Sequence, residues 1–579
     1  MQSVKSPARE PLNNTLTAAQ VFAAALHRHG VEYIFGQSIP SALILAAPDY
    51  GIRQVGYRTE NAGTVMADGY ARISRKVPVV TAQNGPAATL LVPGLAEALK
   101  ASVPIVAVVQ DVSRAFTDKN AFQELDHLEI FKGSAKWIKR LTDASRIDDY
   151  VDMAFTAAAS GRPGPAVLIV PMDLFNEVLD SDTAPRQASL GHFPLDRVSA
   201  DPAQIAKAAE LLAGASKPLI IAGGGIHLSD AGPELAALQE TASLPVATTV
   251  MGKGSVDERH PLSVGVVGYF MGTRGLTKDL RSMVTNADVV LLVGNRTNQN
   301  GTDSWTLYPK NAKYIHIDID GQEIGRNYEA LRLTGDAKLT LAALKEALAG
   351  KDLSRRTERR AEIESEIAAG RRSSSEAGSQ SSSEATPIRP ERLMRDLDTV
   401  LDEDTIVVAD ASYSSIWVAN FLTSRKAGQR IISPRGLAGL GWGLPLAMGA
   451  KVARPNSKVF CLTGDGGFAH VWSELETARR MGINVVVAVL NNQILGYQKH
   501  AEKVGFGAYT DVCDFAPVDH AAIARACGCE GIRIEKPSDF LPALKEAFSA
   551  DRTVLLDIVT DERAYPPITS FEANSALAY

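Results

Sequence analysis

The stretch 458–497 constrains the fold most, because two short apolar, β-branched runs flank a segment with helical periodicity. The runs 459–462 and 485–490 each stop at small or polar residues, as buried parallel strands do. Apolar residues recur at helical spacing over 469–481. The stretch therefore predicts a strand, loop, helix, strand unit with a right-handed crossover.

Glycines and polar residues follow both predicted strands. Gly464, Asp465, Gly466 and Gly467 come after the first strand, and Asn492 comes after the second. The carboxyl ends of neighbouring parallel strands form the crevice where open α/β sheets bind ligands. A carboxylate, an amide oxygen and the N–H groups that open a helix suit Mg2+ holding a diphosphate. We therefore predict a metal–diphosphate site, with an ordinary tight turn as the alternative.

Length and charge bound the remaining possibilities. At about 100–200 residues per domain, 579 residues give three or four domains. A net charge of −6 gives no indication of a basic surface that would bind nucleic acid or an anionic membrane. The first residues contain no apolar signal core, and the four cysteines contain no C-x-x-C pair. We expect a cytoplasmic protein with free thiols that binds neither nucleic acid nor membrane.

The Gly-Asp-Gly turn with Asn-Asn after the next strand resembles the thiamine diphosphate signature of one superfamily. Its members include acetolactate synthases, pyruvate oxidases, oxalyl-CoA decarboxylases and 2-hydroxyacyl-CoA lyases. The resemblance implies thiamine diphosphate and Mg2+ as cofactors. It makes Asp465 and Asn492 side-chain ligands of the metal, and the backbone carbonyl of Ile494 a third ligand.

The segment 57–72, Y-R-T-E-N-A-G-T-V-M-A-D-G-Y-A-R, resembles the activating-glutamate segment of the same superfamily. We expect Glu60 at a strand end, with 61–71 helical. By the resemblance, Glu60 donates to N1′ of the aminopyrimidine and promotes the imino tautomer that takes the proton from the thiazolium carbon. Burial against an apolar ring would raise its pKa and suit proton exchange near neutral pH. The pattern alone also fits a capping acid.

Two further segments resemble synthase loops: A-Q-N-G-P-A-A-T at 82–89 and N-A-F-Q-E at 120–124. The resemblance places Gln123 and Phe122 against the thiazolium from the partner subunit, and Asn84 on the substrate side. It also implies a homodimer or homotetramer. A polar loop residue without a catalytic role is the alternative for Gln123.

Two segments nearer the C-terminus complete the predicted cofactor site. Ser412 and Tyr413 follow a predicted strand in V-V-A-D-A-S-Y-S-S, as a second loop against the diphosphate. The string at 435–450 resembles a synthase string, and Leu440 of this chain stands where that string has a methionine. That methionine lies beneath the cofactor and enforces its V shape, a positioning effect. Ordinary glycine-rich helix packing is the alternative.

Alternating strands and helices predict an α/β protein with three doubly wound parallel-sheet domains. We assign a pyrimidine-binding domain to 1–190, a central nucleotide-binding-like domain to 191–350, a linker to 351–388, a diphosphate and Mg2+ domain to 389–560, and a possible lid to 561–579. The linker begins as a charged amphipathic helix and continues as a flexible, serine-rich segment.

A triple glycine in 217–226 follows a predicted strand in the central domain but lacks the full G-x-G-x-x-G spacing. Family members hold FAD or ADP there, and others hold nothing. The resemblance implies Arg162 or Arg296 near phosphate and Asp318 or Asp320 near adenosine. If the site is used, we predict ADP ahead of FAD.

The segment after Asn492 bears on the reaction. In biosynthetic acetohydroxyacid synthases this segment resembles E-x-Q-G-M-V-x-Q-W-Q, and its tryptophan selects the larger ketoacid. In this chain Ala501 stands at the position of that tryptophan. We predict a lyase that cleaves 2-hydroxyacyl-CoA reversibly to formyl-CoA and an aldehyde or ketone, with the small molecule or CoA thioester as its partner. The alternatives are a catabolic acetolactate synthase or other pyruvate-using carboligase or decarboxylase, and a non-catalytic paralogue.

Gln493 stands where many synthase-type relatives carry a glutamate in reach of the reactive face of the cofactor. Glutamine keeps the shape of that side chain but cannot titrate. We therefore group Gln493 with Glu60 and Gln123 as catalytic candidates and predict slow proton transfer. A packing role at the strand end is the alternative.

Overall fold

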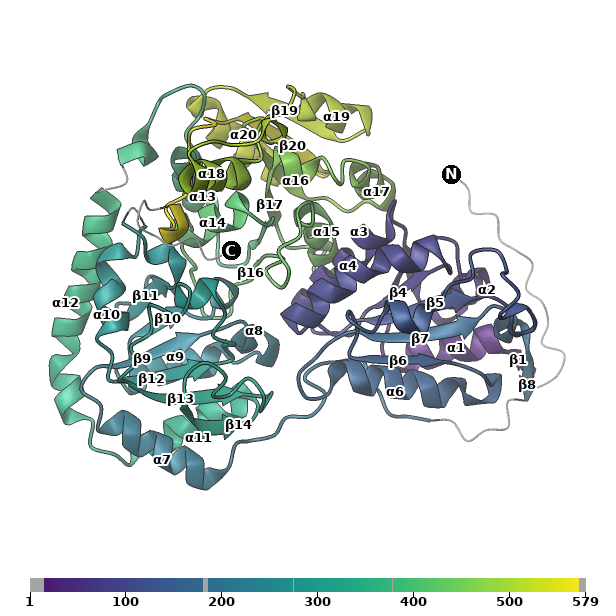
Figure 1. Ribbon diagram of the computed structural model, residues 1–579, viewed down its shortest axis with the longest axis horizontal. Coiled ribbons are helices and arrows are strands. Elements are labelled where there is room, and N and C mark those ends of the chain that lie inside the picture. Colours follow the sequence, from purple (N-terminus) through teal and green to yellow (C-terminus); the bar gives the residue numbers. More distant parts are fainter. Residues whose placement is uncertain (1–14, 181–185, 274, 377–378, 572–579) are drawn as a thin grey trace.

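The computed structural model describes residues 15–180, 186–273, 275–376 and 379–571. Three six-stranded parallel sheets, each covered by helices, make up most of it (Figure 1). The predicted fold class is therefore confirmed. No helix in these ranges is long and apolar enough to cross a membrane.

The first sheet has the strand order β3-β2-β4-β5-β7-β6. Its strands are β2 (Tyr33–Phe35), β3 (Arg53–Val55), β4 (Val79–Ala82), β5 (Val106–Asp111), β6 (Trp137–Arg140) and β7 (Ala166–Pro171). The main helices around it are α1 (Ala18–Arg28), α3 (Glu60–Ser74), α4 (Pro86–Ala101) and α6 (Ile147–Ala159). A short antiparallel pair, β1 (Thr15–Thr17) and β8 (Val178–Asp180), lies beside this sheet.

The central sheet has the order β11-β10-β9-β12-β13-β14. Its strands are β9 (Pro218–Ala222), β10 (Val246–Thr248), β11 (Ser263–Val266), β12 (Val289–Val293), β13 (Lys313–Asp318) and β14 (Ala330–Thr334). Its main helices are α7 (Pro202–Ala213), α9 (Gly232–Thr241), α11 (Ala337–Ala349) and α12 (Ser354–Glu376). Strand β12 is apolar and buried throughout, because helices cover both faces of a parallel sheet.

The third sheet has the order β16-β15-β17-β18-β20-β19. Its strands are β15 (Ile406–Ala409), β16 (Ile431–Ile432), β17 (Val459–Gly464), β18 (Val486–Asn491), β19 (Glu530–Ile534) and β20 (Val554–Val559). Its helices are α13 (Pro390–Val400), α14 (Tyr413–Phe421), α15 (Gly443–Ala453), α16 (Asp465–Phe468), α17 (Glu474–Met481), α18 (Gly496–Phe506), α19 (His520–Ala526) and α20 (Pro537–Ser549).

Three local predictions differ from the structure. The helix expected over 469–481 begins only at Glu474, as α17, because turns and a bend occupy 469–473, and the short helix α16 precedes that range. Glu60 is the first residue of α3 rather than the end of a strand, because the Thr59 hydroxyl caps that helix by accepting from the Ala62 N–H. Helix α12 continues to Glu376, into the segment expected to be a flexible linker.

Helices α3 and α15 join the first domain to the third (Figure 1). A Cβ atom on Gly69 would lie 2.2 Å from the Leu446 carbonyl oxygen, and one on Gly449 would lie 1.8 Å from the Met66 carbonyl oxygen. Only glycine permits backbones to approach this closely. The two glycine-containing helices that the sequence assigns to cofactor binding are therefore packed against each other within one chain.

Candidate active site

Asp465 and Asn492 lie at the carboxyl ends of β17 and β18, which pair directly in the sheet. One Asp465 carboxylate oxygen accepts from the Gly466 N–H at 2.8 Å, and the other accepts from the Gln493 N–H at 2.5 Å. The Asn492 side-chain oxygen accepts from the Ile494 N–H at 3.3 Å. Burial disfavours the charged form of Asp465 and raises its pKa to about 6. A cation bound beside this carboxylate would stabilise the charged form.

A cavity at this edge gathers the predicted residues of the third domain. Its lining includes Ser412, Tyr413, Leu440, Gly464, Asp465, Gly466, Gly467, Asn492 and Ile494. Gln493 is the exception: its backbone is left-handed (φ 59°), and its N–H group rather than its side chain supports Asp465. The structure thus brings the predicted ligands together, while their roles stay predictions.

The residues present fit a metal-bound diphosphate. A Cβ atom on Gly464 would meet nothing within 4 Å, so this turn leaves open space beside Asp465. One carboxylate, one amide oxygen and one carbonyl form the oxygen donor set that Mg2+ prefers. No group of three His, Cys, Asp or Glu residues in the described ranges could hold a metal. A metal at this edge therefore depends on the oxygens of Asn492 and Ile494.

On the first domain, Glu60 is 8% exposed at the start of α3, and burial raises its pKa. The backbone N–H groups of Arg58 and Thr59, just before it, donate to the buried carboxylate of Glu474 from α17. Glu474 was not predicted to matter. It fixes the start of α3 against the third domain, and thereby the place of Glu60.

Asn84 and Gln123, which the sequence analysis placed in two separate loops, lie together within one chain. The Asn84 amide donates to the carbonyl oxygens of Phe122 (3.2 Å) and Gln123 (3.0 Å). Gln123 has a left-handed backbone (φ 60°), and its side-chain oxygen is buried without a hydrogen-bond partner in the described part of the chain. Such strain is typical of functional positions, and Gln123 stays a candidate.

The two halves of the predicted site form separate hollows within one chain. Asn84 and Phe122 line a hollow built from first-domain residues alone. The described residues that line the cavity at Asp465 come from the central domain, the third domain and, at Ala564, the tail. Glu60 lines neither of them.

Comparison with known proteins identifies the three domains. Residues 16–130, 205–344 and 410–558 match the N-terminal TPP binding domain, the central domain and the C-terminal TPP binding domain of thiamine pyrophosphate enzymes. A probable acetolactate synthase large subunit of Methanococcus aeolicus is 34% identical over 564 residues, covering 94% of this chain and 92% of that protein.

The chain belongs to the thiamine pyrophosphate enzyme family. Its two TPP-binding domains imply thiamine diphosphate as the cofactor. Among other relatives, acetolactate synthase of Arthrospira platensis is 33% identical over 97% of both chains. The acetolactate synthase isozyme 2 large subunit of Escherichia coli K12 is 29% identical over 97% of this chain and 99% of its own.

Two buried carboxylates of this thiamine pyrophosphate enzyme hold the loop that carries Leu440. Asp410, after β15, accepts from the N–H groups of Gly441, Trp442 and Gly443 at 3.0–3.1 Å. The sequence analysis did not single it out, although it lies in the quoted V-V-A-D-A-S string. Hydrogen bonds from several N–H groups to one carboxylate fix a loop strongly.

Glu97 holds the other end of the same loop. Its carboxylate accepts from the Gly436 N–H at 2.8 Å and the Leu437 N–H at 2.5 Å. Arg72 lies 3.5 Å from Glu97 and is also bonded to Asp68, so the buried charge has a counter-ion. A glutamate inside the apolar helix α4 was the signal for this contact, because glutamate is rarely buried without a partner.

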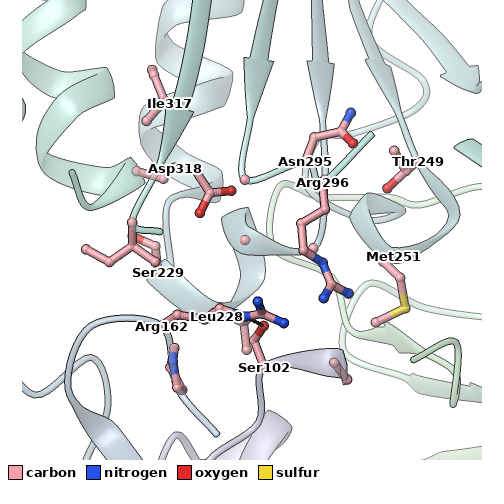
Figure 2. A pocket seen from close by; sticks show the side chains of 18 of the residues that line it. Ser102, Arg162, Leu228, Ser229, Thr249, Met251, Asn295, Arg296, Ile317 and Asp318 are labelled. Atoms are coloured by element: carbon pink, nitrogen blue, oxygen red, sulfur yellow. Dashed lines mark hydrogen bonds between the residues drawn. The ribbon is translucent and has the colours of Figure 1, made fainter. Parts of the chain in front are cut away.

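A second cavity lies between the first and central domains and gathers the predicted nucleotide residues (Figure 2). Arg162 and Arg296 both line it, but Arg162 is already paired with Asp320 (3.4 Å) and Glu323 (3.2 Å). Arg296 has no ion pair within the described ranges. Asp318 lines the same cavity, and burial raises its pKa to about 6. Arg296 is thus the cation left for a ligand.

Proposed function

We propose that this enzyme is a pyruvate-using carboligase of the acetolactate synthase type. It would release CO2 from one 2-ketoacid and join the remaining two-carbon unit to the keto carbon of a second. The observation that carries the proposal is near-full-length similarity to acetolactate synthase large subunits, at 34% identity for one of them. It favours this reading over the 2-hydroxyacyl-CoA lyase that the sequence motifs led us to predict.

Different residues of the protein would bind the cofactor and transfer the proton. Thiamine diphosphate, when bound, supplies the electron sink for carbon–carbon bond cleavage and formation. Asp465, Asn492 and the Ile494 carbonyl would hold Mg2+ and the diphosphate. Leu440, at the tip of a loop fixed at both ends, would support the bent cofactor, and Glu60 would hold a proton at N1′ of the aminopyrimidine.

Incubation with pyruvate, thiamine diphosphate and Mg2+ tests the proposal. We expect one acetolactate and one CO2 for every two pyruvate molecules consumed, measured as acetoin after acid treatment and as labelled CO2. Formyl-CoA release from a 2-hydroxyacyl-CoA, with no CO2 from pyruvate, would instead establish the lyase.

One observation keeps the lyase as a second candidate. Ala501, at the position where biosynthetic synthases carry a tryptophan, is 3% exposed in α18 and packs in the apolar core beside the cavity residue Tyr497. The described part of the tail lies over the cavity: the Phe571 ring is 5.4 Å from that of Tyr497 and 6.0 Å from that of Tyr413. This supports the predicted lid, whose residues 572–579 lie outside the described ranges.

We also propose that the active site forms between subunits of a homodimer or homotetramer. The separate hollows of the first and third domains support this, because a second copy could bring Glu60 and Gln123 to the cavity at Asp465. An isologous interface would then complete two sites at once.

We propose that the cavity lined by Arg296 binds an adenine nucleotide, and we favour ADP over FAD. Arg296 would bind one of its phosphates. We predict that Arg296→Gln weakens ADP binding roughly 10–150-fold, the effect of losing a charged hydrogen bond of about 1.5–3 kcal/mol. Isothermal titration of purified protein measures it. Arg259→Gln, an exposed arginine of the central domain paired with Asp257, is the matched control and should bind ADP normally. Flavin absorbance in the purified protein would favour FAD instead.

A further inference from the structure

Among the described residues that line the cavity at Asp465, Arg435 is the single one with a cationic side chain. The other described residues that line it are apolar, neutral polar or, at Asp410 and Asp465, acidic. We propose that Arg435 binds the carboxylate of the acceptor 2-ketoacid and thereby selects substrates that keep a free carboxylate. This rests on the proposed carboligase function and adds a residue that determines its specificity.

Arg435 is available for an anion. Its guanidinium donates to the Tyr269 hydroxyl at 2.5 Å and to the Ser415 hydroxyl at 3.3 Å, and both partners are neutral. It forms no ion pair with any residue in the described ranges. A half-buried guanidinium whose partners are hydroxyl groups keeps its charge unbalanced. A carboxylate matches the planar fork of arginine and would supply the missing charge.

The backbone holds Arg435 in place. The next residue, Gly436, donates its N–H to the buried Glu97 carboxylate at 2.8 Å. Tyr269 is 4% exposed and comes from the central domain, so the guanidinium is fixed from a second side. Binding to a group that is already positioned costs less conformational entropy than binding to a free surface arginine.

The strand order separates Arg435 from the metal end of the cavity. Arg435 follows β16, whereas Asp465 follows β17, and β15 lies between these two strands. Neighbouring strands are about 4.8 Å apart, so the ends of β16 and β17 lie roughly 10 Å from each other, and Arg435 comes three residues after β16. Diphosphate oxygens on a metal at Asp465 would occupy the far end. The anion at Arg435 is therefore assigned to the substrate.

The reaction chemistry assigns Arg435 to the carboxylate of the acceptor ketoacid rather than to that of the donor. The donor ketoacid loses its carboxylate as CO2, and a guanidinium bound to that group would stabilise the ground state and slow the cleavage. The acceptor keeps its carboxylate: a new carbon–carbon bond forms at its keto carbon, and its keto oxygen takes up one proton. Two pyruvate anions and one proton thus give one acetolactate anion and one CO2. A cation can hold the acceptor throughout.

Arg435→Gln and Arg435→Lys are the test variants, and Arg552→Gln, a 62% exposed arginine of the same domain, is the control. On the holoenzyme with pyruvate, we expect Arg435→Gln to lower acetolactate formation roughly 10–150-fold, while CO2 release continues and acetaldehyde replaces acetolactate. Arg435→Lys should recover part of the loss because the charge remains. Cofactor affinity, followed by tryptophan fluorescence, should be unchanged in all three variants.

A binding measurement keeps the test independent of turnover. Oxamate is an unreactive analogue of pyruvate, and its affinity for the wild-type holoenzyme should fall in Arg435→Gln by the same factor as carboligation. Equal oxamate affinity in both proteins, or no oxamate binding to the wild type, would overturn the inference. Weaker cofactor binding with unchanged oxamate affinity would assign Arg435 to the diphosphate. If the wild type releases no CO2 from pyruvate, the proposed function fails, and the oxamate result still decides the role of Arg435.

Discussion

Turnover should fall roughly 10²–10⁴-fold when Glu60 is replaced by glutamine, the range that general acid–base groups contribute. Glutamine keeps the size of the side chain but cannot exchange a proton with N1′ of the aminopyrimidine. Burial raises the pKa of Glu60, as that exchange near neutral pH requires. Steady-state rates on pyruvate measure the loss.

Cofactor binding separates this role from a structural one. Tryptophan fluorescence should show that Glu60→Gln still binds thiamine diphosphate and Mg2+, because the metal and diphosphate lie at the other end of the cofactor. Glu129→Gln is the matched control, since Glu129 is an exposed glutamate of the same domain whose carboxylate pairs with Lys132. A Glu60→Gln enzyme with more than about a tenth of the wild-type rate would remove Glu60 from the acid–base chemistry.

The fold and the metal edge could be predicted from sequence because both depend on local patterns. Apolar runs that stop at Asp465 and Asn492 place both residues at strand ends, and neighbouring parallel strands must bring them together. The start of α3 was misplaced because capping by Thr59 extends the helix to include Glu60. Helix boundaries depend on such single hydrogen bonds, which hydrophobic periodicity does not report.

The residues that hold the site in place were missed because their partners are distant in sequence. Glu97 contacts Gly436 across the domain boundary, and Glu474 contacts Arg58. Nothing in the pattern around either glutamate indicates its partner. Arg435 is the first residue of the string at 435–450, but the neutrality of its hydrogen-bond partners is a property of the folded chain.

The choice of reaction was the weakest inference from sequence. Ala501 in place of a tryptophan was weighed as evidence against a synthase, yet the similar proteins over the whole chain are acetolactate synthases. A specificity residue changes which acceptor fits and leaves the cofactor chemistry as it was. One substitution therefore says less about the reaction than similarity over nearly the whole chain does.

Replacing Asp465 with alanine should also abolish activity, but through loss of cofactor. Mutation of a residue that hydrogen-bonds to a metal ligand typically lowers metal affinity about 10–100-fold. Mutation of a direct ligand should therefore lower metal affinity roughly 100-fold or more. Mg2+-dependent thiamine diphosphate binding, measured by fluorescence, should show this loss. Asp404→Ala is the control, because Asp404 is an exposed aspartate paired with Lys426 in the same domain. Normal cofactor binding by Asp465→Ala would refute the metal assignment.

The two inactive variants together test whether the site spans subunits. Glu60→Gln and Asp465→Ala chains, co-expressed with different affinity tags and purified through both, give mixed dimers. If each site combines the first domain of one chain with the third domain of the other, one site of the mixed dimer has both wild-type residues and the second has neither. About half of the wild-type activity per dimer should then return. If each site lies within one chain, every site lacks one residue and the mixed dimer stays inactive.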